Sequence, residues 1–160
     1  MEDTWRPLKA PENIVGMQAA IWSEMLRDVT MFHYQLFPRL IAFAERAWHK
    51  ASWETSKNKQ WTKHEDWRDF VNGVGYKELI RLKNRNIKYR IPPPGVRYTD
   101  DDKIEICSKF PGLTFLFRQV TDDDSSNWSD CIDGQPIPDK TATYEFVTYD
   151  GERRSRPIRL

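Results

Sequence analysis

The sequence predicts an α+β fold, with one strand and several helices in its first 90 residues and a small antiparallel β-sandwich in the remainder. Three observations support this division. A continuous apolar run at residues 14–21 is followed by segments whose apolar residues recur at helical spacing. The segment 91–95, Ile-Pro-Pro-Pro-Gly, cannot extend a helix and marks a boundary. The segments after it alternate polar and apolar residues with a period of two.

The first element that we expect is a buried strand over residues 14–24. Its apolar and small residues run without alternation, which is typical of a strand that is covered on both faces. The strand ends in Trp22-Ser23-Glu24, and strand residues two apart point to the same side. Trp22 and Glu24 can therefore line one pocket wall, where a sugar would lay its C–H face on the indole and donate hydroxyls to the carboxylate. The alternative is a core tryptophan beside a buried, paired glutamate.

Helices are expected after this strand. A connector over 25–35 leads to an amphipathic helix over about 37–50, which begins near Phe37-Pro38. The segment 62–65, Thr-Lys-His-Glu, is a capping box that predicts the start of a second helix. Glycines 73 and 75 should end or interrupt that helix, and a short one should follow over 76–84. The tryptophans of this half either form a sugar platform or pack the helices, and the tendency of large aromatic residues to be buried favours packing.

We therefore divide the chain into residues 1–90, a proline-rich linker at 91–95, and an immunoglobulin-like β-sandwich at 96–160. Strands of the sandwich are predicted within 103–109, 113–118 and 141–149, with a turn at Asp150-Gly151. The strand at 14–24 has no visible partner in the first part. Alone it would expose both edges and both faces to water, which suggests that the chain is the tail of a larger protein whose sheet lies upstream.

Composition and motifs argue against several classes of function. The 25 basic and 24 acidic residues are mixed, so nothing indicates nucleic-acid binding. No apolar run is long enough to span a membrane, and residues 1–7 lack the apolar segment of a signal peptide. The three histidines lack the spacing of metal ligands. The Asp runs at 100–102 and 122–124 suit solvated turns better than calcium-binding loops. The sequence has no glycine-rich phosphate-binding loop, so nothing in it indicates a nucleotide cofactor. Whether Cys107 and Cys131 form a disulfide stays open.

Two motifs carry a resemblance to a known family. Residues 16–24, Gly-Met-Gln-Ala-Ala-Ile-Trp-Ser-Glu, followed by residues 37–48, closely resemble the end of the catalytic barrel of β-N-acetylhexosaminidases, especially chitobiases. The resemblance continues more loosely to the C-terminal sandwich of that family. It implies that residues 14–24 and about 37–50 are the last strand and helix of a (β/α)8 barrel. It also implies a glycoside hydrolase of secreted, periplasmic or lysosomal location that removes terminal N-acetylglucosamine or N-acetylgalactosamine from oligosaccharides such as chitobiose.

The resemblance assigns substrate-binding roles to Trp22, under the terminal sugar, and to Glu24, as acceptor from its outer hydroxyls. In this family the acetamido group of the substrate attacks the anomeric carbon, assisted by an Asp-Glu pair on an earlier strand. That dipeptide is absent here, since Glu2-Asp3 and Glu65-Asp66 have the reverse order. We therefore expect the isolated chain to be inactive without the missing N-terminal barrel portion, and to hold no catalytic residue, metal or cofactor. The alternative is a short gene product that acts as a non-catalytic carbohydrate-binding or interaction module.

Overall fold

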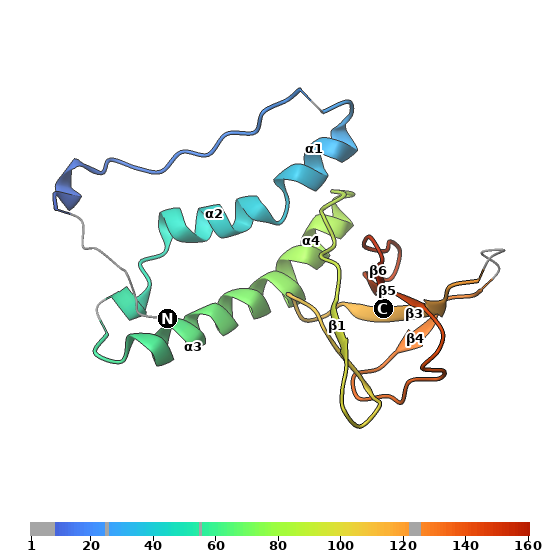
Figure 1. The fold of residues 1–160 in the computed structure, drawn as a ribbon. Helices are drawn as coiled ribbons and strands as arrows, with labels where there is room; N and C mark the ends of the chain where they lie inside the picture. The colour runs from blue at the N-terminus through green and yellow to red at the C-terminus, as the bar shows by residue number, and fades with distance from the viewer. Residues whose placement is uncertain (1–8, 25, 55, 122–125) are drawn as a thin grey trace.

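The computed structural model describes residues 9–24, 26–54, 56–121 and 126–160. The predicted acidic turn at 122–124 and the Glu2-Asp3 pair lie outside these ranges. A helical part comes first and a β part follows it (Figure 1). The helices are α1 (Val29–Leu36), α2 (Arg39–Trp48), α3 (Lys59–Gly73) and α4 (Leu79–Asn84), with short 3-10 helices at Pro11–Asn13 and Ser52–Glu54. The described residues contain no helix that is long and apolar enough to cross a membrane.

The predicted strand over residues 14–24 is not formed in this structure. The segment runs as an extended, exposed stretch on the far side of α1 and α2 from the β part (Figure 1). Val15 is fully exposed, and 79% of Trp22 is accessible to solvent. The physical reason is the absence of neighbours, because an apolar strand is stable only where adjacent strands satisfy its backbone and cover its faces. None of the other segments described in the first 90 residues pairs with it.

Helix α1 lies where a connector was predicted. Its first turn is held by Asp28, whose side chain accepts a hydrogen bond of 2.8 Å from the backbone N–H of Met31. Helix α2 confirms the predicted amphipathic helix, although its apolar residues face two directions. Ile41 packs against the buried core, whereas Leu40 and Trp48 are exposed. Neither α2 nor α1 contains a buried residue.

Helix α3 begins earlier than the capping box predicted. Asn58 is the N-cap, and its side chain accepts from the N–H of Trp61 at 3.4 Å. Thr62 lies within the first turn and donates its hydroxyl to the carbonyl of Asn58 at 3.0 Å. The predicted interruption near the glycines is confirmed, since a π-helical turn at Val74–Glu78 joins α3 to α4. A Cβ on Gly75 would lie 2.3 Å from the carbonyl oxygen of Pro111, so this glycine permits close contact with the β part.

The β part contains two antiparallel sheets. Strands β1 (Gly95–Tyr98) and β2 (Ile104–Cys107) form a hairpin. The second sheet has the order β4-β3-β5-β6 and consists of β3 (Thr114–Gln119), β4 (Ser129–Cys131), β5 (Tyr144–Tyr149) and β6 (Ile158–Arg159). The three strands predicted from period-two alternation are therefore present as β2, β3 and β5. Ile104 and Ile106 of β2 join Phe146 of β5 in one core, so the two sheets share a single apolar interior.

The two cysteines are free thiols on different sheets. Cys107 is exposed at the end of β2, whereas Cys131 is buried in the core of the β part. Burial, together with the nearby carboxylate of Asp133, raises the pKa of the Cys131 thiol to about 11. Cys131 therefore behaves as a packing residue in this structure rather than as a reactive thiolate.

A second core connects the helical part to the β part. It includes Val74, Leu79 and Leu82 from the helices and Phe110 from the loop that precedes β3. A polar network adjoins it, in which the Tyr89 hydroxyl donates to Asp150 at 3.2 Å and Arg153 Nη1 donates to the carbonyl of Tyr89 at 3.0 Å. These contacts hold α4 and the linker firmly against the turn after β5.

Candidate functional site

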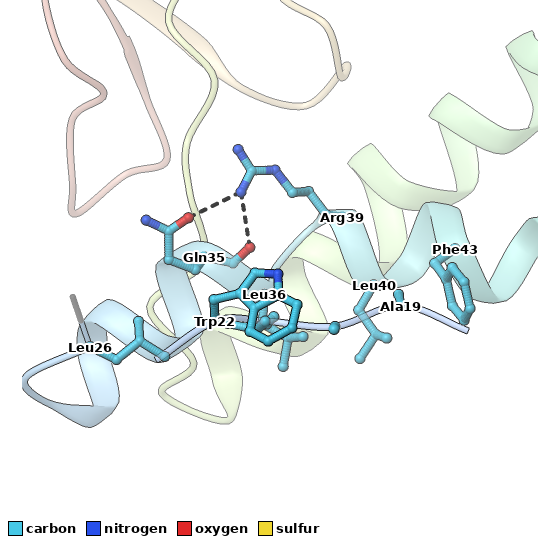
Figure 2. Close-up of a pocket in the computed structure, with 10 residues that line it drawn as sticks. Ala19, Trp22, Leu26, Gln35, Leu36, Arg39, Leu40 and Phe43 are labelled. Atoms are coloured by element: carbon cyan, nitrogen blue, oxygen red, sulfur yellow. Dashed lines mark hydrogen bonds between the residues drawn. The ribbon is translucent and has the colours of Figure 1, made fainter. Parts of the chain in front are cut away.

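The candidate site is a cavity of about 460 Å³ between the extended segment and the corner formed by α1 and α2 (Figure 2). Residues 19–22 line one side of it. The other lining residues are largely apolar and come from α1, α2 and the stretch before them: Leu26, Gln35, Leu36, Arg39, Leu40 and Phe43. The corner exists because α1 ends at Leu36 and α2 begins three residues later, directly after Pro38.

The structure brings only one of the two predicted site residues to this cavity. Trp22 lines it and keeps most of its indole accessible. Glu24 lies in the turn that follows and is not among the lining residues. Because residues 14–24 have no strand hydrogen bonds here, strand geometry does not hold the two side chains on the same side. The cavity therefore has the aromatic wall predicted from the sequence without the carboxylate.

Arg39 supplies the polar edge of the cavity. Its Nη1 donates to the carbonyl of Gln35 at 3.2 Å and to the Gln35 side-chain oxygen at 3.1 Å (Figure 2). Sequence reasoning did not assign either residue to the site. The only available signal was the position of Arg39 directly after Phe37-Pro38, and the corner was hidden because α1 was not predicted. An apolar cavity with one guanidinium and one amide can hold a ring and accept or donate hydrogen bonds, but it has no acid–base pair.

Two carboxylates with buried side chains, Glu145 and Asp150, are not poised for catalysis. Glu145 is ion-paired with Arg118 and Arg159, each at 2.8 Å, and hydrogen bonding from Arg118 holds its pKa below the usual range. Burial raises the pKa of Asp150, but hydrogen bonds from the backbone of Arg153 and Glu152 outweigh that effect and lower it. A general acid of a glycosidase needs a raised pKa. These carboxylates are therefore structural ion-pair partners.

The described residues contain no cluster of three His, Cys, Asp or Glu side chains that could hold a metal ion. His49 Nε2 lies 3.0 Å from Asp66 on α3 and 3.9 Å from Glu45. His33 accepts from the backbone N–H of Lys88 through Nδ1. In the turn at 100–102, hydrogen bonds from Lys103 and Thr99 lower the pKa of Asp101 to about 2, so this carboxylate is already paired.

Most tryptophans of the helical part are not core residues. Trp48, Trp61 and Trp67 are 91%, 62% and 48% exposed in this chain, and the prediction that such tryptophans pack the helices against a barrel or the sandwich stays a prediction. Trp53 is flanked by two cations, with the Arg46 guanidinium 5.4 Å and the Lys63 ammonium 5.6 Å from its ring centre. The helical surface therefore presents several indole faces to solvent.

Comparison with known families identifies two parts of the chain. Residues 1–51 match the family "Glycosyl hydrolase family 20, catalytic domain", and residues 78–157 match the "Chitobiase/beta-hexosaminidase C-terminal domain". The chain belongs to the family 20 β-hexosaminidases. It carries the tail of their catalytic domain followed by their C-terminal domain. The candidate site lies in the catalytic tail, because all its lining residues fall between 19 and 43.

Individual relatives support the same family assignment. The N,N'-diacetylchitobiase of Vibrio harveyi is 32% identical over 154 residues, which cover 88% of this chain and 17% of the relative. A β-hexosaminidase of Vibrio vulnificus is 33% identical over 125 residues, covering 66% of this chain and 15% of the relative. A β-hexosaminidase B of Pseudoalteromonas piscicida is 59% identical over 39 residues, covering 24% of this chain and 5% of the relative. The chain spans about one sixth or less of the length of these relatives.

Proposed function

We propose that this chain supplies part of the sugar pocket of a β-N-acetylhexosaminidase that removes terminal N-acetylglucosamine or N-acetylgalactosamine from oligosaccharides such as chitobiose. One observation carries the proposal: an apolar segment, exposed and unpaired, ends in Trp22 at the edge of an open cavity. In the complete protein, residues 14–24 would form the last strand of a (β/α)8 barrel and α2 the last helix. The missing N-terminal barrel portion would provide the neighbouring strands.

The exposed side chains of the segment support this arrangement. Val15, Met17 and Ile21 expose large apolar surfaces on one short segment, next to Trp22. Exposed apolar surface that is continuous along a segment marks a surface made for burial against another part of a protein. Pairing with a neighbouring strand would bury these residues and would also place Trp22 and Glu24 on one side of the chain.

In that strand, Trp22 and Glu24 would lie at the carboxyl end, where the active sites of such barrels are found. Trp22 would stack on the C–H face of the terminal sugar, and Glu24 would accept hydrogen bonds from its outer hydroxyls. Acid–base catalysis would come from an Asp-Glu pair outside this chain, so residues 1–160 alone would not hydrolyse substrate. The β part would be an immunoglobulin-like sandwich at residues 96–160.

The proposal can be tested with a chimera, in which the region of the Vibrio harveyi chitobiase that matches this chain is replaced by residues 1–160. We expect the chimera to hydrolyse 4-nitrophenyl N-acetyl-β-glucosaminide and the isolated chain to show no turnover. Trp22→Ala and Glu24→Gln should each raise KM and lower kcat, reducing kcat/KM by about 100-fold, because their contacts tighten at the transition state.

Trp61→Ala is the matched control, since Trp61 is an exposed indole of α3 outside the cavity. It should leave both constants within about twofold of those of the chimera. Unchanged kinetics in both the Trp22 and the Glu24 variants would remove these residues from the pocket. If the isolated chain binds chitobiose but the chimera hydrolyses no substrate, the result would instead favour a non-catalytic carbohydrate-binding module.

A further inference from the structure

A second cavity, of about 440 Å³, lies where α2 and α3 meet the linker before β1 and the loop between β2 and β3. Four separate segments of the chain line it, so its shape depends on the packing of the helical part against the β part. Its volume falls within the range of cavities that bind small ligands, about 300–1,000 Å³. None of its features enters the function proposed above, apart from Arg39, which borders both cavities.

The charges around this cavity are all positive. Arg39, Arg90 and Lys109 line it, and no carboxylate does. In the described part of the chain, none of these three cations forms an ion pair: Arg39 bonds to Gln35, and the Arg90 guanidinium lies over the ring of Tyr34, 5.5 Å from its centre. Three cationic residues that line one cavity, without a carboxylate among them, give it a positive potential. The complementary ligand is an anion.

The walls of the cavity are flat and apolar. Trp67 and Phe70 of α3 form one wall, with ring centres 5.6 Å apart, and Pro92 and Pro93 form another. Trp67 and Phe70 also line an adjoining cavity of about 260 Å³, which contains Trp53. An aromatic wall in a cavity that cations also line suits the C–H face of a pyranose ring that carries a charged substituent.

We propose that this cavity binds an anionic sugar, meaning a hexose or hexosamine that carries a sulfate, phosphate or carboxylate group. The sugar ring packs on Trp67 and the prolines, while Lys109 and Arg90 hold the anionic group. A sugar fits better than an acidic peptide, because the site is a cavity with an aromatic wall in a chain of a glycosyl hydrolase family. The proposal does not depend on the roles of Trp22 and Glu24.

Titration calorimetry on the 160-residue chain tests this proposal with four probes: N-acetylglucosamine 6-sulfate, N-acetylglucosamine 6-phosphate, glucuronic acid and uncharged N-acetylglucosamine. At least one of the anionic sugars should bind at least tenfold more tightly than the uncharged sugar. The sugar that binds most tightly identifies which anionic group, sulfate, phosphate or carboxylate, the cavity prefers. Its affinity should fall as salt is raised, because the cations are partly exposed. Binding should also change the fluorescence of Trp67.

Lys109→Gln should weaken the anionic sugar about fivefold, and Trp67→Ala about tenfold. Lys77→Gln is the control, because Lys77 carries the same charge just beyond α3 but does not line this cavity. It should leave affinity unchanged, and all three variants should keep the circular dichroism of the parent chain. Two further probes, inorganic sulfate and an oligoglutamate peptide, test whether the sugar ring matters. The proposal is overturned if no anionic sugar binds, if inorganic sulfate binds as tightly as the sulfated sugar, or if only the oligoglutamate peptide binds. It is also overturned if Lys77→Gln weakens binding as much as Lys109→Gln.

Discussion

The catalytic tail and the C-terminal part of this chain differ in how completely they bury their apolar residues. Helices α1 and α2 contain no buried residue, and the segment before them exposes Val15, Met17 and Trp22. In contrast, five of the six residues of β5 are buried, and α4 buries Leu79 and Leu82. The C-terminal part therefore buries its apolar residues within this chain, whereas the catalytic tail leaves apolar side chains exposed to solvent. Stability measurements should separate the two regions.

The largest expected effect comes from the centre of the β part. Phe146 is fully buried and stacks on Phe117 with ring centres 6.1 Å apart. Phe146→Ala should reduce the free energy of unfolding by about 3–5 kcal/mol, since it leaves a cavity in a packed core. Urea denaturation followed by circular dichroism measures this loss.

The matched variant in the catalytic tail is Leu40→Ala, which removes an apolar side chain that is already 39% exposed. It should cost less than about 1 kcal/mol, because little apolar surface is returned to water. An equal loss in the two variants would show that the tail shares the stability of the β part, and would break the contrast between them.

The same contrast explains which parts of the fold could be predicted from sequence. Strands β2, β3 and β5 follow from local alternation, and each finds a partner within the chain, β2 with β1 and β3 with β5, so the prediction and the structure agree. The edge strands β4 and β6 are three and two residues long and depend on their neighbours, and so leave little pattern. Residues 14–24 have the composition of a buried strand but no partner among the described residues. The sequence already indicated this lack of a partner, because no other segment of the first 90 residues has the pattern of a strand.

The candidate site was predictable to a similar extent. Trp22 was accessible to sequence reasoning because it ends an apolar run, and the structure places it at a cavity. Gln35 and Arg39 were not, since their meeting depends on α1, whose start is marked only by the single N-cap Asp28. The second cavity is lined by residues as distant in the sequence as Arg39 and Lys109, and such a meeting follows from tertiary packing rather than from any motif.

An intermediate effect is expected where the helices meet the β part. A Cβ on Gly75 would meet the carbonyl oxygen of Pro111 at 2.3 Å, a backbone atom that cannot move away cheaply. Gly75→Ala should therefore destabilise the chain by about 1–3 kcal/mol, as overpacking does in other well-packed cores. Differential scanning calorimetry should show a lower unfolding temperature.

Gly73→Ala sharpens this test, because a Cβ at Gly73 would meet no atom within 4 Å. Alanine favours the helix over glycine by up to about 1 kcal/mol, so this variant should be neutral or slightly stabilising. If both alanines behave alike, the close contact between the helix and the loop before β3 does not contribute to stability.

An effect of similar size at neutral pH is expected from the polar network around Asp150, and this effect should depend on pH. Asp150 accepts from the backbone N–H of Arg153 at 2.7 Å and from its guanidinium at 2.9 Å, and its pKa is lowered in the folded chain. A carboxyl whose pKa is lowered by folding stabilises the protein above its unfolded pKa, near 4, and loses that contribution as the pH falls through the folded value. Asp150→Asn should therefore cost about 1–3 kcal/mol at pH 7 and progressively less below pH 4.

Asp28→Asn is the corresponding change in the catalytic tail. Asparagine caps a helix about as well as aspartate, so the α1 cap should persist and the free energy of unfolding should change by less than about 0.5 kcal/mol at any pH. Urea unfolding of both variants and the parent chain between pH 2.5 and 7 gives the comparison. A constant difference between Asp150→Asn and the parent across that range would mean that Asp150 contributes through packing rather than through its charge, and the junction would then be held mainly by its apolar core.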